Sequence, residues 1–305
     1  MSKKIVLIAG PTASGKSKIA IEIAKKIKGE IINADSMQVY KEFSILSSRP
    51  STTDLKKVKH HLYGFQSVKK HFSTGIWLKL VKKQINQCLK DKKIPILVGG
   101  TGLYFEAITK GMSKIPNIDS KKRNKIRDLQ KKIGQNKFYE KLLKLDPLAR
   151  NKIDPFDTQR SLRAYEVKKF TKKSIFKWYK LTKSEFTQFQ IFKIFINVPR
   201  EKLLKKMLGR AEQMFKDNCI KEVESFLKLN IKSSLSANKI IGVQEIKDYL
   251  SGILNISQTK ELINIKTRQY AKRQVTWARG HMSDWNMQYS NNFSSLSKKI
   301  LKAIS

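Results

Sequence analysis

Short apolar runs alternate with helical repeats over the first third of the chain. Residues 5–8, 30–35 and 94–98 have the apolar character of buried strands. Between them, residues 16–27 and 73–90 place apolar side chains three or four positions apart, as one face of a helix does. Strands and helices that alternate with short links predict a parallel sheet covered by helices. Ligands on such sheets bind at the carboxyl ends of the strands.

The strand pattern stops at about residue 116, and lysine-rich helical patterns follow as far as residue 190. It returns at residues 192–200, which we expect to rejoin the sheet. We therefore predict an α/β fold with an α-helical insertion domain at 116–190, and a catalytic core at 1–115 plus 191–305. The rest of the chain is helical in pattern, with spans expected near 200–228, 243–251, 257–279 and 294–304.

The residues that follow the first expected strand match the phosphate-binding pattern G-x-x-x-x-G-K-[ST]. The backbone amides of such a loop, with the positive end of the next helix, hold phosphate groups. Lys16 adds a mobile charge, and the Ser17 hydroxyl offers a ligand to Mg²⁺. The predicted sheet is therefore of the P-loop type. The loop consists of Gly10, Pro11, Thr12, Ala13, Ser14, Gly15, Lys16 and Ser17.

The acid that an ordinary P-loop triphosphatase uses is missing from its usual place. Such an enzyme needs a second apolar strand ending in an acid that holds magnesium through water, whereas this strand ends in residues 99–101, Gly-Gly-Thr. Asp35 is the acid expected at a strand end on this side. It is either a turn or capping residue, or a general base beside the phosphates. Its neighbours Ser36, Gln38 and Tyr40 favour recognition of a nucleic-acid base.

The charge of the chain indicates a polyanionic partner. There are 64 basic and 24 acidic residues, a formal net charge of +40. Such an excess favours nucleic-acid binding, although part of it is also expected on the solvated surface of a lysine-rich chain.

Cysteine use and hydropathy indicate a cytoplasmic protein without a membrane segment. Cys88 and Cys219 lie in amphipathic patterns and are expected to be buried free thiols in a reducing compartment. The N-terminus lacks an apolar signal segment, and no run of about 18 apolar residues occurs. The four histidines show no metal-ligand spacing, so a structural zinc site is not expected.

Six ordered segments carry a specific resemblance that covers nearly the whole chain. They are GPTASGKS, DSMQVY, HHLYGF at 60–65, GGTGLY, DPFDTQRSLRAYEV at 154–167 and KRQVTWARG at 272–280. In order and spacing the chain resembles the tRNA dimethylallyltransferases, the isopentenyl-tRNA transferase family. The chain departs from the family at residues 242–244, which are Gly-Val-Gln where the family usually has Gly-Tyr-Lys or Gly-Tyr-Arg. This departure weakens the expectation that residues 239–245 contact tRNA as they do in the family.

The resemblance implies a reaction that the loop pattern alone would hide. A dimethylallyl group would pass from dimethylallyl diphosphate to N6 of adenosine 37 in certain tRNAs, giving N6-dimethylallyladenosine (i6A) and diphosphate. The loop, which by itself indicates nucleotide or ATP binding, would then hold the diphosphate of an isoprenoid. No acid is needed after Val98, because no water attacks a γ-phosphate. Mg²⁺ near Ser17 is the implied cofactor, and the anticodon stem-loop of tRNA is the implied partner. Since nothing in the sequence suggests an obligate interface, we expect a monomer.

The resemblance also implies roles for single residues. Asp35 would take the proton of the adenine amine, and Thr101 would orient the amine or the base. Lys16 and Arg210 would stabilise the departing diphosphate; without the resemblance, Arg210 reads as a solvated helix residue. The implied tRNA-binding residues are Asp35, Ser36, Met37, Gln38 and Thr101 at the adenine, Arg123, Gln159, Arg160, Ser161, Leu162 and Arg163 in the insertion, and Lys272, Arg273 and Arg279 near the C-terminus.

Helical geometry adds two expectations. Asp157 or Thr158 is expected to cap the helix that carries Arg160 and Arg163. Along the C-terminal helix, at about 100° per residue, three cations fall within about 40° of one another, with two aromatic residues nearly opposite. We expect the aromatic residues in the core and the cations at RNA phosphates. The cations are Arg268, Lys272 and Arg279, and the aromatic residues are Tyr270 and Trp277.

Two other functions are compatible with parts of this pattern. A small-molecule or nucleotide kinase uses the same loop and needs an arginine-bearing lid, which the insertion could supply. A non-catalytic RNA-binding protein would explain the charge, but not the joint presence of Lys16, Ser17, Asp35 and Thr101.

Overall fold

The structure is a computed structural model that describes residues 3–289 and 293–304, and only the backbone of residues 293 and 294. The chain forms two compact units, one of residues 1–107 and 186–305 and the other of residues 108–185. The stretches next to the helices of the second unit bond to each other. Ser113 Oγ lies 2.6 Å from Thr182 Oγ1, and Ser184 Oγ donates to the Ile108 carbonyl at 2.5 Å. These bonds hold the connecting stretches of this unit to each other, and most of the expected insertion, 116–190, lies within it.

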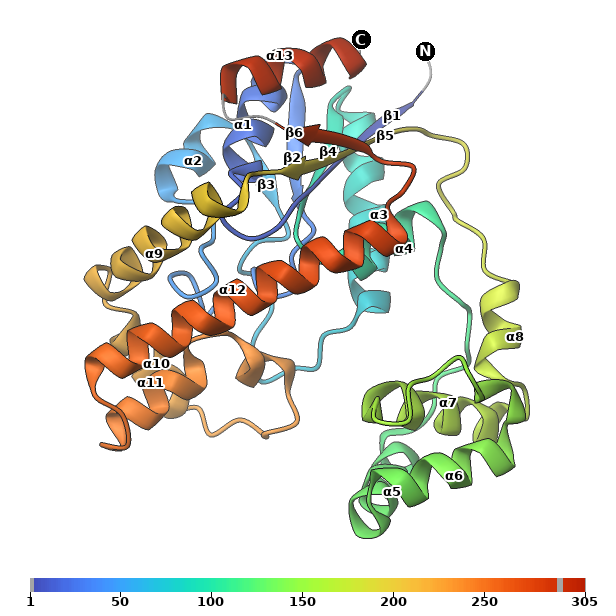
Figure 1. Cartoon of the computed structure of the whole chain (residues 1–305). Helices are drawn as coiled ribbons and strands as arrows, with labels where there is room; N and C mark the ends of the chain where they lie inside the picture. The colour runs from blue at the N-terminus through green and yellow to red at the C-terminus, as the bar shows by residue number, and fades with distance from the viewer. Residues whose placement is uncertain (1–2, 290–292, 305) are drawn as a thin grey trace. The chain divides into compact units, whose positions relative to one another are not determined.

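A six-stranded, all-parallel sheet forms the centre of the larger unit, in the order β3-β2-β4-β1-β5-β6. The strands expected from apolar runs occupy its middle, where helices cover both faces (Figure 1). Two short strands were not expected, because His-His and Asn-Met-Gln-Tyr carry no apolar run. The strands are β1 (Lys4–Ala9), β2 (Gly29–Asn33), β3 (His60–His61), β4 (Ile94–Gly99), β5 (Gln190–Asn197) and β6 (Asn286–Tyr289).

Alternate side chains of each strand enter different cores. Val6 and Ile8 of β1 pack with Ile19 and Ile23 of α1 (Lys16–Lys26) on one face, which α1 and α13 cover together. Ile5, Leu7 and Ala9 point the other way, toward the face covered by α3 (Thr74–Lys90). The remaining helices of this unit are α2 (Thr52–Lys57), α4 (Gly102–Thr109), α9 (Arg200–Lys216), α10 (Cys219–Leu227), η2 (Ser236–Lys239), α11 (Val243–Leu250), α12 (Ile256–His281) and α13 (Phe293–Ile304).

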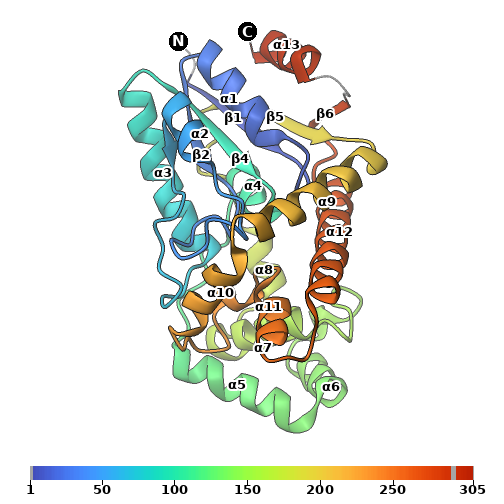
Figure 2. The same cartoon turned by 90° about the vertical axis from the view of Figure 1, so that its left-hand side faces the viewer.

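Local capping explains where the C-terminal helices begin and end. The expected helix at 200–228 is two helices, because Asn218 adopts φ +66° and its side chain accepts a hydrogen bond from the Lys221 amide, which starts α10. The long helix α12 starts with a capping box, in which Asn255 and Gln258 each accept the other's backbone N–H. Figure 2 shows α9 and α12 as separate long helices in the same region of the unit.

The smaller unit is an all-helical bundle with its own apolar core. Phe138 and Leu142 of α6 pack there with Tyr165 of α7, and all three are buried. Asp157 caps α7 by accepting a hydrogen bond from the Arg160 amide at 2.9 Å, so Asp157 and not Thr158 is the cap. Its helices are α5 (Ser120–Ile133), α6 (Gln135–Leu145), η1 (Pro147–Ala149), α7 (Thr158–Thr171) and α8 (Ile175–Lys180).

The state of the two cysteines and the hydropathy of the helices are as the sequence predicts. Cys88 and Cys219 are free thiols and both are buried. Within the described ranges, no helix is long and apolar enough to cross a membrane.

The loops that follow β2 and β4 are held against each other. The Ala34 amide donates to the Val98 carbonyl at 2.8 Å, and the Thr101 amide donates to the Ala34 carbonyl at 3.2 Å. This approach is possible only because residue 99 is glycine: a Cβ there would lie 2.0 Å from the Ala34 carbonyl oxygen. The two strand ends therefore present their loops as one surface.

Replacing this glycine should destabilise the protein. Gly99→Ala forces two backbone segments apart, and we expect the free energy of unfolding to fall by about 2 kcal/mol, as overpacking does. The matched control is Gly209→Ala in α9, where a Cβ meets no described atom within 4 Å and helix propensity should add about 0.5–1 kcal/mol. Urea unfolding measures both, and equal stability of the Gly99→Ala protein and the unchanged protein would contradict the close approach.

Candidate functional site

The loop between β1 and α1 has the curvature of an anion-binding nest. Ala13 at φ +61° and Gly15 at φ +83° are in the left-handed region, which turns successive backbone N–H groups toward one point. Gly10 permits a close approach: a Cβ there would lie 2.8 Å from the Ile196 carbonyl and 2.9 Å from Ser14 Oγ. The loop is thus pressed against β5, with its amides at the start of α1.

A cavity of about 440 Å³ lies over this loop. Thr12, Lys16 and Ser17 line it from the loop, Asp35 from the end of β2, and Arg210 from α9. Lys16 Nζ donates to the Pro11 carbonyl at 3.2 Å, and Arg210 Nη1 donates to Thr12 Oγ1 at 2.8 Å. Lys16, Arg210 and the Asp35 carboxylate therefore face the same space, which Lys239 and Arg273 also line.

Burial makes both cations poorly solvated. It lowers the pKa of Lys16 to about 8; nearby Asp35 opposes the shift and Arg210 adds to it. Burial also lowers the pKa of Arg210, against the attraction of Asp35. The Arg210 Nε group is buried and has no hydrogen-bond partner among the described residues. A buried, unpartnered N–H is costly, so this cavity favours an anion that supplies oxygen acceptors.

Asp35 is both a turn residue and a cavity residue. Its Oδ1 accepts a hydrogen bond from the Met37 amide at 2.9 Å, and its own amide donates to Asn33 Oδ1 at 2.8 Å. Within the described part of the chain, Oδ2 receives no such bond. The two interpretations that the sequence left open are therefore compatible, since one oxygen shapes the turn while the residue also lines the cavity.

Thr101 and Gln38 act within the neighbouring loops. Thr101 Oγ1 accepts from the Ser36 amide at 2.9 Å and donates to Ser36 Oγ at 3.2 Å, which joins the loops after β4 and β2. Gln38 Nε2 donates to the carbonyls of Ser47 and Ser48. In this structure the Gln38 amide group therefore holds the cavity wall, although Gln38 was expected to contact RNA.

One important residue, Gln274 of α12, was missed by the sequence interpretation. Its Oε1 accepts from the Thr12 amide at 2.8 Å, and its Nε2 donates to the Gly100 carbonyl at 2.9 Å. Gln274 thereby joins the phosphate loop to the loop after β4. The signal was available, because Gln274 lies one helical turn from Tyr270, within a segment that carries the family resemblance.

The expectation that Tyr270 and Trp277 lie in the core was wrong. Both are only partly buried, and both line a second cavity, of about 320 Å³. The Trp277 ring packs directly against the backbone of Gly102, where a Cβ would lie 2.2 Å from the ring. The aromatic face of α12 is turned toward the strand ends, where the loops leave a hollow, and not toward packed side chains.

The two cavities adjoin. Met37, Tyr270 and Arg273 line both of them, and the second also includes Ser36 and Thr101. The sequence-predicted residues at the phosphate loop, at Asp35 and at Thr101 are therefore brought together in one connected site.

The cations of α12 divide between two faces. Arg273 lies beside the connected site, with its guanidinium 5.9 Å from the centre of the Tyr270 ring. Arg268, Lys272 and Arg279 line a different cavity, of about 680 Å³, next to α9. The expected alignment of these three cations is confirmed, because all three line this cavity. Lys272 and Arg279 therefore lie away from the cavity over the phosphate loop.

The predicted residues of the helical unit are partly exposed and partly buried. Arg160 is 73% exposed and pairs with Asp157 at 2.7 Å, and Gln159 is also exposed. Arg123 and Arg163 both approach the buried Glu166 carboxylate, at 3.4 and 3.6 Å. Ser161 and Leu162, expected among the RNA contacts, are buried on the core face of α7.

The lowered pKa of Lys16 predicts how anion binding depends on pH. Below about pH 8 the Lys16 amine is charged and can bind an anion directly. Above this pH the amine must first take up a proton before the anion binds. The association constant of inorganic pyrophosphate should then fall by up to about tenfold per pH unit.

Isothermal titration calorimetry on both sides of pH 8 measures this slope. Lys16→Arg is the control, because arginine stays charged throughout, and the ligand's own titration is common to both proteins. Parallel pH profiles for the two proteins would rule out the titration of Lys16.

Comparison with known proteins agrees with the geometry. The family model described as IPP transferase matches residues 38–281. A tRNA dimethylallyltransferase of Pelagibacter ubique is 56% identical over 92% of this chain and 90% of its own. One of Rickettsia canadensis is 43% identical over 95% of this chain and 90% of its own.

Solved structures extend the likeness to the fold. A tRNA isopentenylpyrophosphate transferase of Bacillus halodurans superposes with a TM-score of 0.71 at 29% identity, covering 99% of this chain and 95% of that one. A eukaryotic dimethylallyltransferase that acts on tRNA gives a TM-score of 0.82 at 24% identity, over 99% and 78% of the two chains, and shares the fold. The protein described here belongs to the IPP transferase family.

Proposed function

We propose that this protein transfers a dimethylallyl group from dimethylallyl diphosphate to N6 of adenosine 37 in tRNA, giving i6A and diphosphate. The observation that carries the proposal is the cavity in which Lys16, Arg210 and Asp35 face one another. The cations suit a departing diphosphate, and the carboxylate suits an amine that must lose a proton. Family membership supports prenyl transfer to tRNA over the kinase and the RNA-binding protein.

The diphosphate would bind over the phosphate loop. Loop amides, Lys16 and Arg210 would surround the oxygens, where negative charge develops as the allylic C–O bond breaks. The unpartnered Arg210 Nε would gain an acceptor. The cavity also has apolar walls suited to a five-carbon isoprenoid and unnecessary for a triphosphate. These walls are formed by Leu46, Met207, Ala211, Met214, Ile240 and Ile263.

The amine would react at the junction of the two cavities. The adenine N6 lone pair is delocalised into the ring, but its N–H becomes acidic as the new C–N bond forms. Asp35 would accept that proton through Oδ2 while Oδ1 keeps its bond from the Met37 amide. Thr101, hydrogen-bonded to Ser36, would hold the loop and orient the amine. The balance is one C–O bond broken, one C–N bond formed and one proton moved to the carboxylate.

The second cavity would receive the adenine. Tyr270 and Trp277 line it and offer surfaces on which a base taken out of the anticodon-loop stack can pack, at an unstacking cost of a few kcal/mol. Because the two cavities adjoin and share Met37, Tyr270 and Arg273, an isoprenoid in one and a nucleotide in the other can meet at their junction. We propose that the protein acts as a monomer, in the cytoplasm where its tRNA substrate is found.

The loop fits the Mg²⁺ that this chemistry implies. The Ser17 hydroxyl and the Asp35 carboxylate line the same cavity, and Mg²⁺ prefers oxygen ligands shared between a few protein groups and substrate phosphates. Bound there, the ion would neutralise charge on the diphosphate. Ser17 is the residue that we propose as its ligand.

The tRNA backbone would contact polar and basic side chains that are at least partly exposed. In the helical unit the proposed contacts are Arg123, Gln159, Arg160 and Arg163, and we leave out the buried Ser161 and Leu162. On α12 Arg273 would reach the nucleotide at the site, while Lys272 and Arg279 would bind phosphates on another face. Since phosphate contacts release counterions, binding should weaken steeply with salt.

One assay separates the three candidate functions. Purified protein is incubated with Mg²⁺, labelled dimethylallyl diphosphate and unmodified tRNA, with a parallel sample containing ATP. We expect label in the tRNA at adenosine 37, located by nuclease digestion. Phosphorylation of an added substrate at the expense of ATP would indicate a kinase, and tRNA binding without either reaction would indicate a binding protein.

Asp35→Asn tests the proposed base. The asparagine keeps the Oδ1 acceptor for the Met37 amide, so the turn should survive, but it cannot take the proton. We expect the rate of transfer to fall by about 10²- to 10⁴-fold with nearly unchanged tRNA affinity, measured by single-turnover kinetics and filter binding. Asp91→Asn, at the exposed end of α3, is the control and should keep full activity. A large loss of tRNA binding in Asp35→Asn would instead assign Asp35 to recognition.

A further inference from the structure

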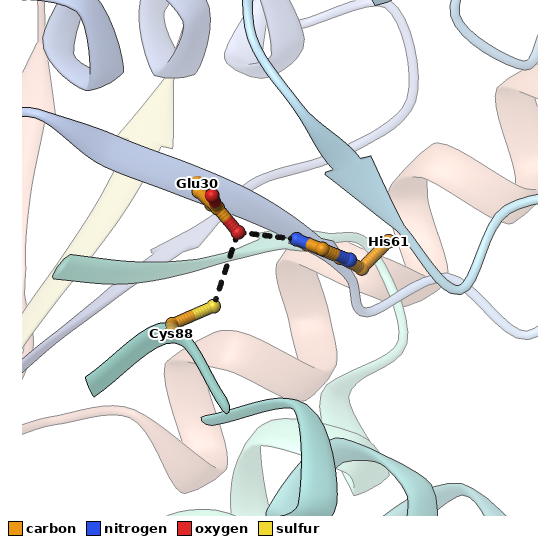
Figure 3. Close-up of side chains that lie close together, drawn as sticks. All are labelled: Glu30, His61 and Cys88. Atoms are coloured by element: carbon orange, nitrogen blue, oxygen red, sulfur yellow. Dashed lines mark hydrogen bonds and ion pairs between the residues drawn. The ribbon is translucent and has the colours of Figure 1, made fainter. Parts of the chain in front are cut away.

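A second group of side chains with metal-binding chemistry lies outside the cavities described above. Glu30 of β2, His61 of β3 and Cys88 of α3 converge, as Figure 3 shows. His61 Nε2 is 2.6 Å from Glu30 Oε2, and Cys88 Sγ is 3.6 Å from the same oxygen. One ligand atom from each residue lies within 4.8 Å of the other two. Spacing along the sequence could not reveal this group, because its members come from three separate elements.

The fold itself brings the three together. The parallel register of β2 and β3 pairs Ile31 with His60 and Ile32 with His61, which places His61 beside the strand that carries Glu30. Cys88 lies on the buried face of α3 against this part of the sheet. The Cys88 side chain is fully buried, whereas the Glu30 and His61 side chains keep 9% and 11% of their surface exposed. An ion would therefore enter beside Glu30 and His61.

The donor set selects a class of metal. A thiolate, an imidazole and a carboxylate suit zinc and similar borderline ions, whereas Mg²⁺ and Ca²⁺ prefer oxygen ligands alone. Zinc bonds of about 2.0–2.3 Å at tetrahedral angles place ligand atoms about 3.2–3.8 Å apart. The Cys88–Glu30 separation already lies in that range, and the His61–Glu30 pair, now at 2.6 Å, would have to open by about 1 Å.

We propose that Glu30, His61 and Cys88 form a binding site for a borderline divalent ion such as Zn²⁺, with a fourth position left to water. On binding, the Cys88 S–H bond is replaced by a sulfur–metal bond and its proton passes to solvent. His61 binds through Nε2 and gives up its hydrogen bond to Glu30. No oxidation or reduction is involved.

The competing interpretation needs no metal. Glu30 and His61 would form a buried ion pair, Cys88 would donate a weak hydrogen bond to the carboxylate, and Lys59 Nζ, 3.7 Å from Glu30 Oε1, would add a charge. Every group then has a partner. Only addition of metal distinguishes the two interpretations.

The site is linked to the loop that carries Asp35. The residue after His61 is Leu62, whose carbonyl accepts from Asn33 Nδ2 at 3.0 Å, and the same amide group donates to the Asp35 carbonyl. On the helix that carries Cys88, Trp77 Nε1 donates to the Asn33 carbonyl at 2.9 Å. A bound ion would therefore stabilise the edge of the sheet and the turn of the proposed base together.

Cobalt substitution tests the proposal without either substrate. Metal-free protein is titrated with Co²⁺, and one equivalent should give a thiolate-to-cobalt absorption band with tetrahedral d–d bands, which Zn²⁺ then bleaches. Oxygen ligands at the phosphate loop give no thiolate band, so that site does not interfere. Cys88→Ser and His61→Gln should abolish the band, and Cys219→Ser, which removes the other buried thiol, should keep it.

Thermal unfolding supplies the second readout. Zn²⁺ should raise the Tm of the unchanged protein and of Cys219→Ser but leave that of Cys88→Ser unchanged, and circular dichroism establishes that each variant is folded. A cobalt spectrum without a thiolate band, or a band that persists in Cys88→Ser, would overturn the proposal. Because no isoprenoid or tRNA is present, this result is independent of the transferase assay.

Discussion

The site depends on two cations that the fold keeps poorly solvated beside one carboxylate. Lys16 and Arg210 are drawn from segments almost two hundred residues apart, and burial lowers the pKa of both. The Arg210 Nε group has no protein partner among the described residues. Asp35 compensates only part of this positive charge. A cavity of this kind is relieved by a polyanion with several oxygen acceptors, which is the chemistry of a diphosphate and of its still more negative form at the moment of departure.

The rest of the larger unit holds that arrangement rigid. The parallel order of the strands places the loops after β1, β2 and β4 at one edge, and two close approaches, at Gly10 and Gly99, leave no room for side chains between backbone segments. Gln274 then joins the loops after β1 and β4 from the side of α12. Because the same helix presents Tyr270 and Trp277 to the second cavity, a single element positions the loop between β1 and α1 and lines the space proposed for the base.

Much of this could be predicted from the sequence, because P-loop chemistry depends on local spacing and on where strands end. The phosphate loop, Asp35 and Thr101 all follow apolar runs, and their meeting at one edge follows from parallel pairing. Features that depend on tertiary packing could not. Helical periodicity predicted that Tyr270 and Trp277 lie on a different face of α12 from the three aligned cations. It could not predict which of these faces lines a cavity and which is exposed to solvent. Ser161 and Leu162 belong to a motif by resemblance, yet their helix buries them. The strand β6 is polar, so no apolar run predicts it, and the apolar pattern does not mark the end of a helix near Asn218. The Glu30–His61–Cys88 group joins residues that have no regular spacing along the sequence.

The most direct test of the central claim is a crystal structure with Mg²⁺ and the unreactive thiolodiphosphate analogue of dimethylallyl diphosphate. The account predicts both phosphates over residues 10–17, between the Lys16 amine and the Arg210 guanidinium, with the allylic carbon directed toward Asp35. Phosphates bound at another place, with the loop between β1 and α1 free of ligand, would contradict it.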